Sequence, residues 1–115
     1  MVRKVFSLAV LAFVAASAYA HHGWSEYDNA TVLNLTGVVK EAGYEHPHGH
    51  VRLETPGKTW VVVLAPPSRM EYRGLAAADL KPGARVSVTG FANRGKPDEM
   101  RAERITVNAK TIELR

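Results

Sequence analysis

The chain has 115 residues, of which 46% are hydrophobic and 23% are charged, a composition typical of one small globular domain. It contains no cysteine, which excludes disulfide bonds, thiolate metal sites, iron–sulfur clusters and thiol nucleophiles. A metal site would therefore have to use histidine, carboxylate or backbone ligands. The formal net charge is +4, but this basic excess is unevenly distributed along the chain.

Residues 1–20 are predicted to be a cleaved secretory signal peptide. A basic start precedes an apolar run, and small residues follow up to an Ala-x-Ala sequence that ends at Ala20. The apolar stretch from Val5 to Ala20 has 16 residues, fewer than the roughly 20 that a membrane-spanning helix needs. Cleavage would leave a periplasmic protein of 95 residues that begins at His21, has a net charge of +2 and does not contact the membrane. The small basic excess and the export both argue against nucleic acid as a partner.

The remaining chain is predicted to be all-β with one short helix. Alternation of apolar and polar residues with a period of two indicates strands over 33–40, 50–54, 86–91, 105–107 and 112–114. The unbroken apolar run over 60–64 indicates a central strand that is covered on both sides. A turn over 55–58 joins the strands over 50–54 and 60–64 into a hairpin. Ser68 and Glu71 have the spacing of a capping box, which predicts a helix over 68–73 that Gly74 closes.

The order of these elements indicates the fold. Three strands, a helix and two or three further strands follow one another in the OB-fold, a partly open five-stranded barrel. We therefore predict a small OB-like barrel of five to six strands over residues 32–115, preceded by an N-terminal arm over residues 21–31. Trp24 and Tyr27 are expected to hold this arm against the barrel. A different small barrel or a sandwich would fit the same pattern.

The histidines carry the strongest functional signal. All five lie in two clusters, which are His21 with His22, and His46 with His48 and His50. Pro47 disfavours a helix, so residues 46–50 are expected to be extended or a turn. If they are extended, the three histidine side chains lie on the outward, polar face of the second strand. Side chains two apart on a strand are separated by about 6.6–6.8 Å, whereas imidazole–metal bonds are about 2 Å long. All three could share one ion only if the chain bent at Gly49.

Signal cleavage would add a second kind of ligand. It would give His21 a free α-amine, which together with the imidazole of the same residue chelates a transition metal. An imidazole from the second cluster would complete a set of three nitrogens, which resembles the histidine brace of copper oxygenases and periplasmic copper-resistance proteins. Such nitrogen sites favour Cu(II), and zinc is a further candidate. Met70 and Met100 adjoin neither cluster, which disfavours Cu(I) transport along methionines.

Plainer interpretations of the same residues stay open. The first cluster could be a solvated terminus, and the second could be a polar loop in which histidine pairs with Glu45 or Glu54. Four basic residues of the last hairpin are expected to form a solvated face: Arg94, Lys96, Arg101 and Arg104. No serine has the context of a nucleophile elbow, so we predict a binding protein rather than an enzyme, although a redox enzyme is a further alternative.

The chain as a whole resembles an uncharacterised family, a domain of unknown function, of small exported bacterial proteins. The resemblance covers residues 21–115 and is carried by His21-His22-Gly23-Trp24, Leu35-Thr36-Gly37-Val38-Val39, Tyr44-Glu45-His46-Pro47-His48, the stretch from Trp60 to Met70 and the stretch from Met100 to Val107. It implies an exported OB-like barrel and no established activity. The family commonly has asparagine where this chain has His46, which favours His48 as the ligand.

We therefore expect a periplasmic protein that binds Cu(II) and acts as a carrier or buffer, with another periplasmic protein as a possible partner. The expected primary ligands are the α-amine and imidazole of His21 and the imidazole of His48, and the expected auxiliary ligands are His22, His46 and His50. The alternative from a different class is a metal-free OB-type module that binds an anionic or saccharide ligand on the strand face that carries Arg52.

Overall fold

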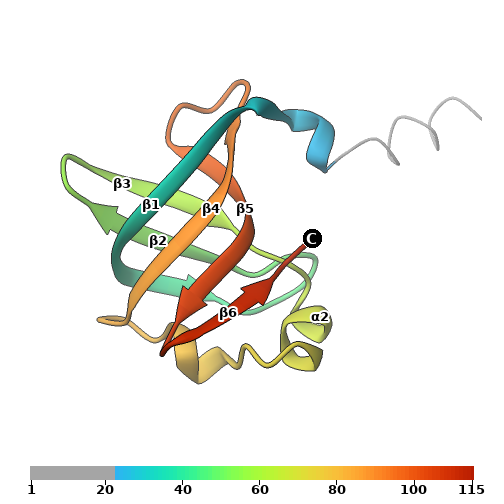
Figure 1. Cartoon of the computed structure of the whole chain (residues 1–115), viewed down its shortest axis with the longest axis vertical. Coiled ribbons are helices and arrows are strands. Elements are labelled where there is room, and N and C mark those ends of the chain that lie inside the picture. Colours follow the sequence, from blue (N-terminus) through green and yellow to red (C-terminus); the bar gives the residue numbers. More distant parts are fainter. Residues whose placement is uncertain (1–22) are drawn as a thin grey trace, which may run out of the picture.

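The computed structural model describes residues 23–115, which form six strands, one α-helix and two 3-10 helices (Figure 1). In chain order these are η2 (Trp24–Glu26), β1 (Tyr27–Gly43), β2 (His50–Thr55), β3 (Lys58–Val63), α2 (Pro67–Tyr72), η3 (Ala77–Leu80), β4 (Arg85–Asn93), β5 (Glu99–Val107) and β6 (Lys110–Glu113). The predicted signal peptide, His21 and His22 lie outside the described residues.

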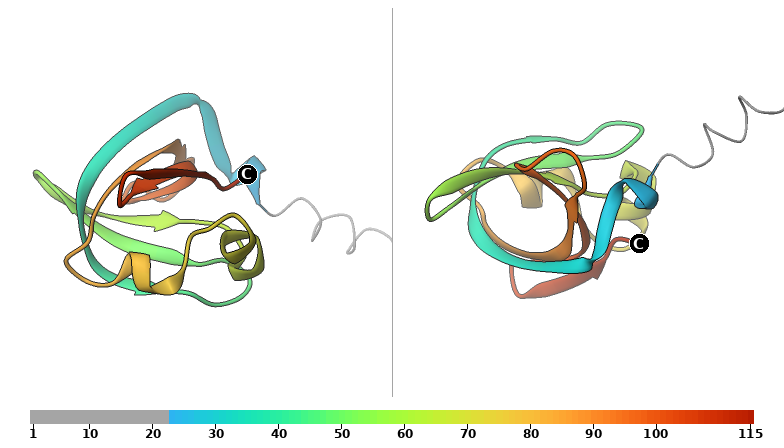
Figure 2. Two further views of the ribbon diagram at one scale, coloured as in Figure 1. Left: turned by 60° about the horizontal axis from the view of Figure 1, so that its bottom comes forward. Right: turned by 90° about the horizontal axis from the view of Figure 1, so that it is seen from above.

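The six strands form one sheet that closes into a ring. Their order is β3-β2-β1-β4-β5-β6, and β3 also pairs with β5. This closing pair is parallel and joins residues 61–63 to residues 99–101, whereas the other pairs are antiparallel. Seen from above, β1 and β4 curve around the ring (right view of Figure 2). The predicted class, an all-β OB-like barrel with one short helix, is confirmed.

Alternating side chains fill the barrel. Along β2, Val51 and Leu53 are fully buried, while Arg52 between them and Glu54 after them are exposed. Val62 of β3, Met100 of β5 and Ile105 of β5 are also fully buried. Burying a side chain of this size stabilises a fold by about 1.5–3 kcal/mol relative to leaving it exposed. The apolar positions of β2 and Ile105 of β5 therefore form part of the core, as the sequence predicts.

The start of the helix differs from the prediction. The sequence predicts Ser68 as its cap, but α2 begins at Pro67, and its N-cap residue Pro66 makes no side-chain capping bond. Proline suits the first helical position because it lacks an amide hydrogen and its φ angle is already helical. The pair of prolines therefore sets the start of the helix, and the predicted capping box is wrong.

The first strand is longer than predicted. It begins at Tyr27, inside the segment expected to be an arm, and ends at Gly43. Its pairing with β4 is interrupted between Asp28 and Val32, where the register shifts. Strand β1 is therefore paired to β4 both before and after this irregularity.

Within residues 23–115, no helix is long and apolar enough to cross a membrane.

Candidate functional site

A cavity of about 230 Å³ lies where the segment before β1 crosses the closing strand pair of the barrel. It is lined by six residues from four parts of the chain: Gly23, Glu26, Tyr27, His48, Val63 and Arg101. Val63 ends β3 and lies opposite Arg101 of β5 in the ladder that closes the ring. The cavity is therefore anchored to the pairing that closes the barrel and has one wall made by the N-terminal segment.

Arg101 is buried, with only 6% of its surface exposed. Its neighbours Met100 and Ala102 belong to the core, so alternation along β5 directs Arg101 to the outside of the barrel. There the indole ring of Trp24 covers it, with the guanidinium carbon 4.2 Å from the ring centroid. The expectation that Arg101 belongs to a solvated face is wrong, because the N-terminal segment lies over this part of the sheet. Arg94 and Lys96 are exposed, as expected.

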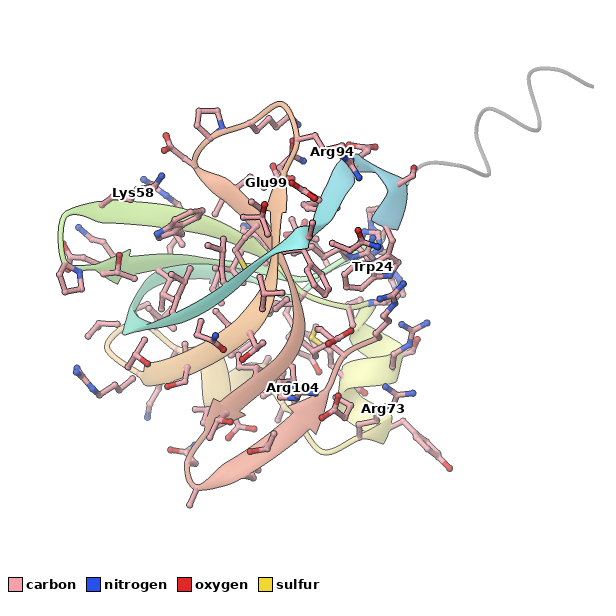
Figure 3. The ribbon with its side chains drawn as sticks, turned by 45° about the horizontal axis from the view of Figure 1, so that its top comes forward. Trp24, Lys58, Arg73, Arg94, Glu99 and Arg104 are labelled. Carbon is pink, nitrogen blue, oxygen red and sulfur yellow. The ribbon has the colours of Figure 1, made fainter. Side chains whose placement is uncertain are left out.

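Aromatic and polar contacts hold the covering segment in place. Trp24 makes edge-on contacts with Tyr27 and Phe91, at centroid distances of 6.4 and 6.0 Å. The hydroxyl of Tyr27 donates to Oε2 of Glu99. Figure 3 shows Trp24, Arg94 and Glu99 on the same side of the barrel, and the backbone N–H of Arg94 donates to the carbonyl of Glu26 at 2.9 Å. The expected anchoring role of Trp24 and Tyr27 is confirmed.

The loop between β1 and β2 places His48 at the cavity. Gly49 donates its N–H to the carbonyl of Ala65 at 2.9 Å and accepts from the N–H of Leu64 at 2.8 Å. A Cβ on Gly49 would lie 2.6 Å from Cε of Met70, so only glycine fits without displacing the helix side chain. These hydrogen bonds and close contacts of Gly49 fix the position of the neighbouring His48, which is half-buried and lines the cavity.

His48 contacts Arg101 directly. Its Nε2 lies 3.3 Å from Nη2 of Arg101. Burial lowers the pKa of His48 below its ordinary value, and the positive charges of Arg101 and Arg69 lower it further. The imidazole is therefore neutral at pH 7. Since arginine only donates, Nε2 of His48 accepts and its proton resides on Nδ1.

The other described histidines lie apart from the cavity wall. Strand β2 begins only at His50, so residues 46–49 form a bent loop rather than an extended strand. His46 is exposed, and the half-buried ring of His50 occupies the space beside Gly43, where a Cβ would lie 2.3 Å from its Cε1. The extended alternative for residues 46–50 is therefore wrong, and the alternative of a turn agrees with the bent loop. Across the described ranges, no group of three or more His, Cys, Asp or Glu side chains is gathered to hold a metal ion.

The charge of Arg101 is poorly compensated by its surroundings. Burial lowers the pKa of its guanidinium, and Arg69 and Arg115 lower it further, while Tyr27 and Glu26 act in the opposite sense. Its Nε is buried without a hydrogen-bond partner among residues 23–115. None of the ion pairs in this part of the chain includes it. Burial of a charge normally requires a paired partner, so this arrangement favours a negatively charged ligand.

Comparison with known proteins identifies the family. The profile of a family of unknown function (DUF6152) matches residues 9–101, most of the chain. The chain belongs to this family. Membership in DUF6152 confirms the prediction of an uncharacterised family. A search of the curated proteins found none that matches the chain.

Among solved structures, the chain is similar to part of a crystal structure in which TiaS is bound to a transfer RNA and ATP, with a TM-score of 0.52 and 22% sequence identity. The similarity covers 77% of this chain and only 20% of that chain. At this level of identity the likeness concerns the fold alone.

Proposed function

We propose that this member of DUF6152 is a periplasmic Cu(II)-binding protein that acts as a carrier or buffer, and that the metal binds at the cavity beside His48. The α-amine and imidazole of His21 and the imidazole of His48 would be the primary ligands. The observation that carries the proposal is that Gly23 lines the same cavity as His48. Gly23 follows His21 by two residues, so a signal peptide cut after Ala20 would leave the new terminus next to the cavity.

The chain length supports this arrangement. Two residues span at most about 7 Å, so the amine and ring of His21 are confined to the neighbourhood of Gly23. That confinement lowers the entropic cost of bringing an N-terminal ligand to His48. Each described part of the site is also held by the barrel, since Gly49 locks the loop of His48.

The protonation state of His48 also supports metal binding. A histidine ligand must be neutral, and His48 meets this requirement at pH 7 without losing a proton. Its single lone pair, however, faces Nη2 of Arg101. Copper binding at Nε2 would therefore require the guanidinium to turn away from His48.

The proposed auxiliary ligands have less support than the primary ligands. His46 is exposed and His50 is half-buried, and neither lines the cavity. A loop rearrangement would be needed to bring either of them to an ion held by His48. We therefore propose three nitrogens as the minimal site, with His22 as the nearest further candidate by sequence.

Electron paramagnetic resonance of the protein beginning at His21, loaded with one equivalent of Cu(II), tests the proposal. We expect nitrogen hyperfine structure that is lost when one glycine precedes His21 and is weakened in His48→Gln. His46→Gln is the matched control and should leave the spectrum unchanged. A spectrum insensitive to both the added glycine and His48→Gln would refute the site.

The face that carries Arg52 offers no comparable support for an anionic or saccharide ligand. Arg52 pairs with Glu41 at 3.4 Å, and Lys40 pairs with Glu54 at 3.8 Å. The charges of this face are thus balanced by neighbouring carboxylates. Of the two ligands in this alternative, only the anionic one has physical support, and that support comes from Arg101.

A further inference from the structure

The cavity contains a buried cation that forms no ion pair within the described chain. Arg101 is 6% exposed and contacts an aromatic ring and a neutral imidazole, but no carboxylate forms an ion pair with it within residues 23–115. Its neighbour Tyr27 does not fill this role, because its hydroxyl donates to Glu99. Cation–π contact with Trp24 offsets part of the cost of burial but satisfies no N–H donor.

We propose that the cavity binds a small monocarboxylate whose carboxylate group is held by the guanidinium of Arg101. Arginine presents a planar fork of donors that matches a carboxylate, and such charge-assisted bonds are about twice as strong as neutral ones. This inference goes beyond copper binding and does not depend on a metal.

The size and walls of the cavity define the ligand further. Its volume of about 230 Å³ lies below the range of about 300–1,000 Å³ that is usual for drug-sized ligands, so the ligand is small. Val63 and the ring of Tyr27 offer apolar surface for a short aliphatic body. Glu26 also lines the wall, and its negative charge disfavours a ligand with more than one negative charge.

Neighbouring cations strengthen the site. Arg69 and Arg115 are close enough to Arg101 to affect its charged form, and the guanidinium carbon of Arg115 lies 4.4 Å from the centroid of the Trp24 ring. Arg69 is held in place by a bond of 3.1 Å from Nη1 to the carbonyl of Leu114. Arg115 also pairs with Glu103 at 3.5 Å, so Arg69 is the neighbour that adds most to the positive potential at Arg101, and this potential attracts an anion from solution.

The fluorescence of Trp24 provides a direct readout because its ring lies against Arg101. The second tryptophan, Trp60, has Lys58 over its ring instead, so a Trp60→Phe background isolates the signal of Trp24. The titration uses sodium butyrate in metal-free buffer at constant ionic strength, with inorganic phosphate and butylammonium as comparison probes. Arg101→Gln removes the charge, and Arg104→Gln is the matched control, since Arg104 lies on the same strand and pairs with Glu113.

We expect a saturable change with butyrate, a Kd at least about tenfold weaker in Arg101→Gln, and an unchanged Kd in Arg104→Gln. Butylammonium should produce no saturable change. The absence of a saturable response to butyrate in the folded parent protein would overturn the proposal, as would equal affinity in Arg101→Gln. Saturation by phosphate but not by butyrate would overturn the assignment to a carboxylate.

A second measurement covers the case in which Arg101→Gln does not fold. Nitrogen-15 NMR of the parent protein during the butyrate titration should show the largest shifts at the side chain of Arg101 and the indole of Trp24. Shifts confined to other parts of the barrel would overturn the proposal.

Discussion

Replacement of Gly90 by alanine tests how β4 and β5 hold Arg101 at the cavity. A Cβ on Gly90 would lie 2.0 Å from the carbonyl oxygen of Arg101 and 2.7 Å from Cα of Ala102. Both atoms belong to the backbone of β5, so relief requires the two strands to separate. The register of the pairing between β4 and β5 also shifts between Thr89 and Gly90, which makes the close approach of the two strands specific to this position.

The magnitude follows from the kind of atoms that clash. Overpacking against side chains costs about 1–3 kcal/mol, and a backbone obstacle gives less relief, so we expect Gly90→Ala to lose about 3 kcal/mol or more. For a domain of this size that corresponds to a fall in Tm of about 12–24 °C. Urea unfolding followed by circular dichroism measures the loss. Gly95→Ala is the matched control, because its Cβ would meet only Oδ1 of Asn93 at 3.9 Å.

A Gly90→Ala protein within about 1 kcal/mol of the parent would refute this reasoning, as would an equal loss in Gly95→Ala. The first result would mean that the strands separate at little cost. In that case the close approach would not be what positions Arg101.

Two further predictions concern titrating groups. Because burial and Arg101 lower the pKa of His48 below 6.5, the unfolded chain binds this proton more readily, and stability should fall as the pH drops below about 6.5. His48→Gln should remove this part of the pH dependence of urea unfolding, and an NMR titration midpoint of His48 at or above 6.5 would contradict the assignment. Asp79 accepts from the N–H of Ala76 at 2.9 Å and from Nζ of Lys110 at 3.0 Å, so Asp79→Ala should cost about 1 kcal/mol at pH 7. These contacts hold the pKa of Asp79 below 3.8, so the difference between parent and variant should shrink as the pH falls below 3.8; a difference that does not decline there would argue against it.

The strands were predictable because their burial has a simple period. Val51 and Leu53 are buried while Arg52 between them is exposed, which is the pattern that the sequence displays. The start of β1 was not predictable in this way, since residues 28–31 have no apolar alternation. There Asp28 accepts from the N–H of Ala30 and from the hydroxyl of Thr31, a local turn in a segment whose flanks are both paired to β4.

The site was predictable only in part. The Pro-His pair draws attention to His48, but the loop that directs it to the cavity depends on contacts of Gly49 with the segment after β3 and with α2, which are distant in sequence. Alternation with Met100 directs Arg101 outward, and an outward side chain is expected to be solvated. The sequence predicts a strand only over 105–107, so this direction follows from the structure, in which β5 begins at Glu99. The predicted solvation of Arg101 is wrong, because Trp24 covers this patch of the outer surface. The period of a strand indicates which way a side chain points, and it does not indicate what lies over it.

The parallel pairing of β3 with β5 has a consequence for self-association. Strands β1 to β5 each have a neighbour on both sides over part of their length, whereas β6 pairs on one side only and forms a lateral edge of the described sheet. That edge has only four residues, with Lys110 at one end and Glu113 at the other. Short edge strands that carry charges resist the addition of a strand from another molecule. The edge that β6 presents is therefore a poor starting point for the aggregation of copies of this protein.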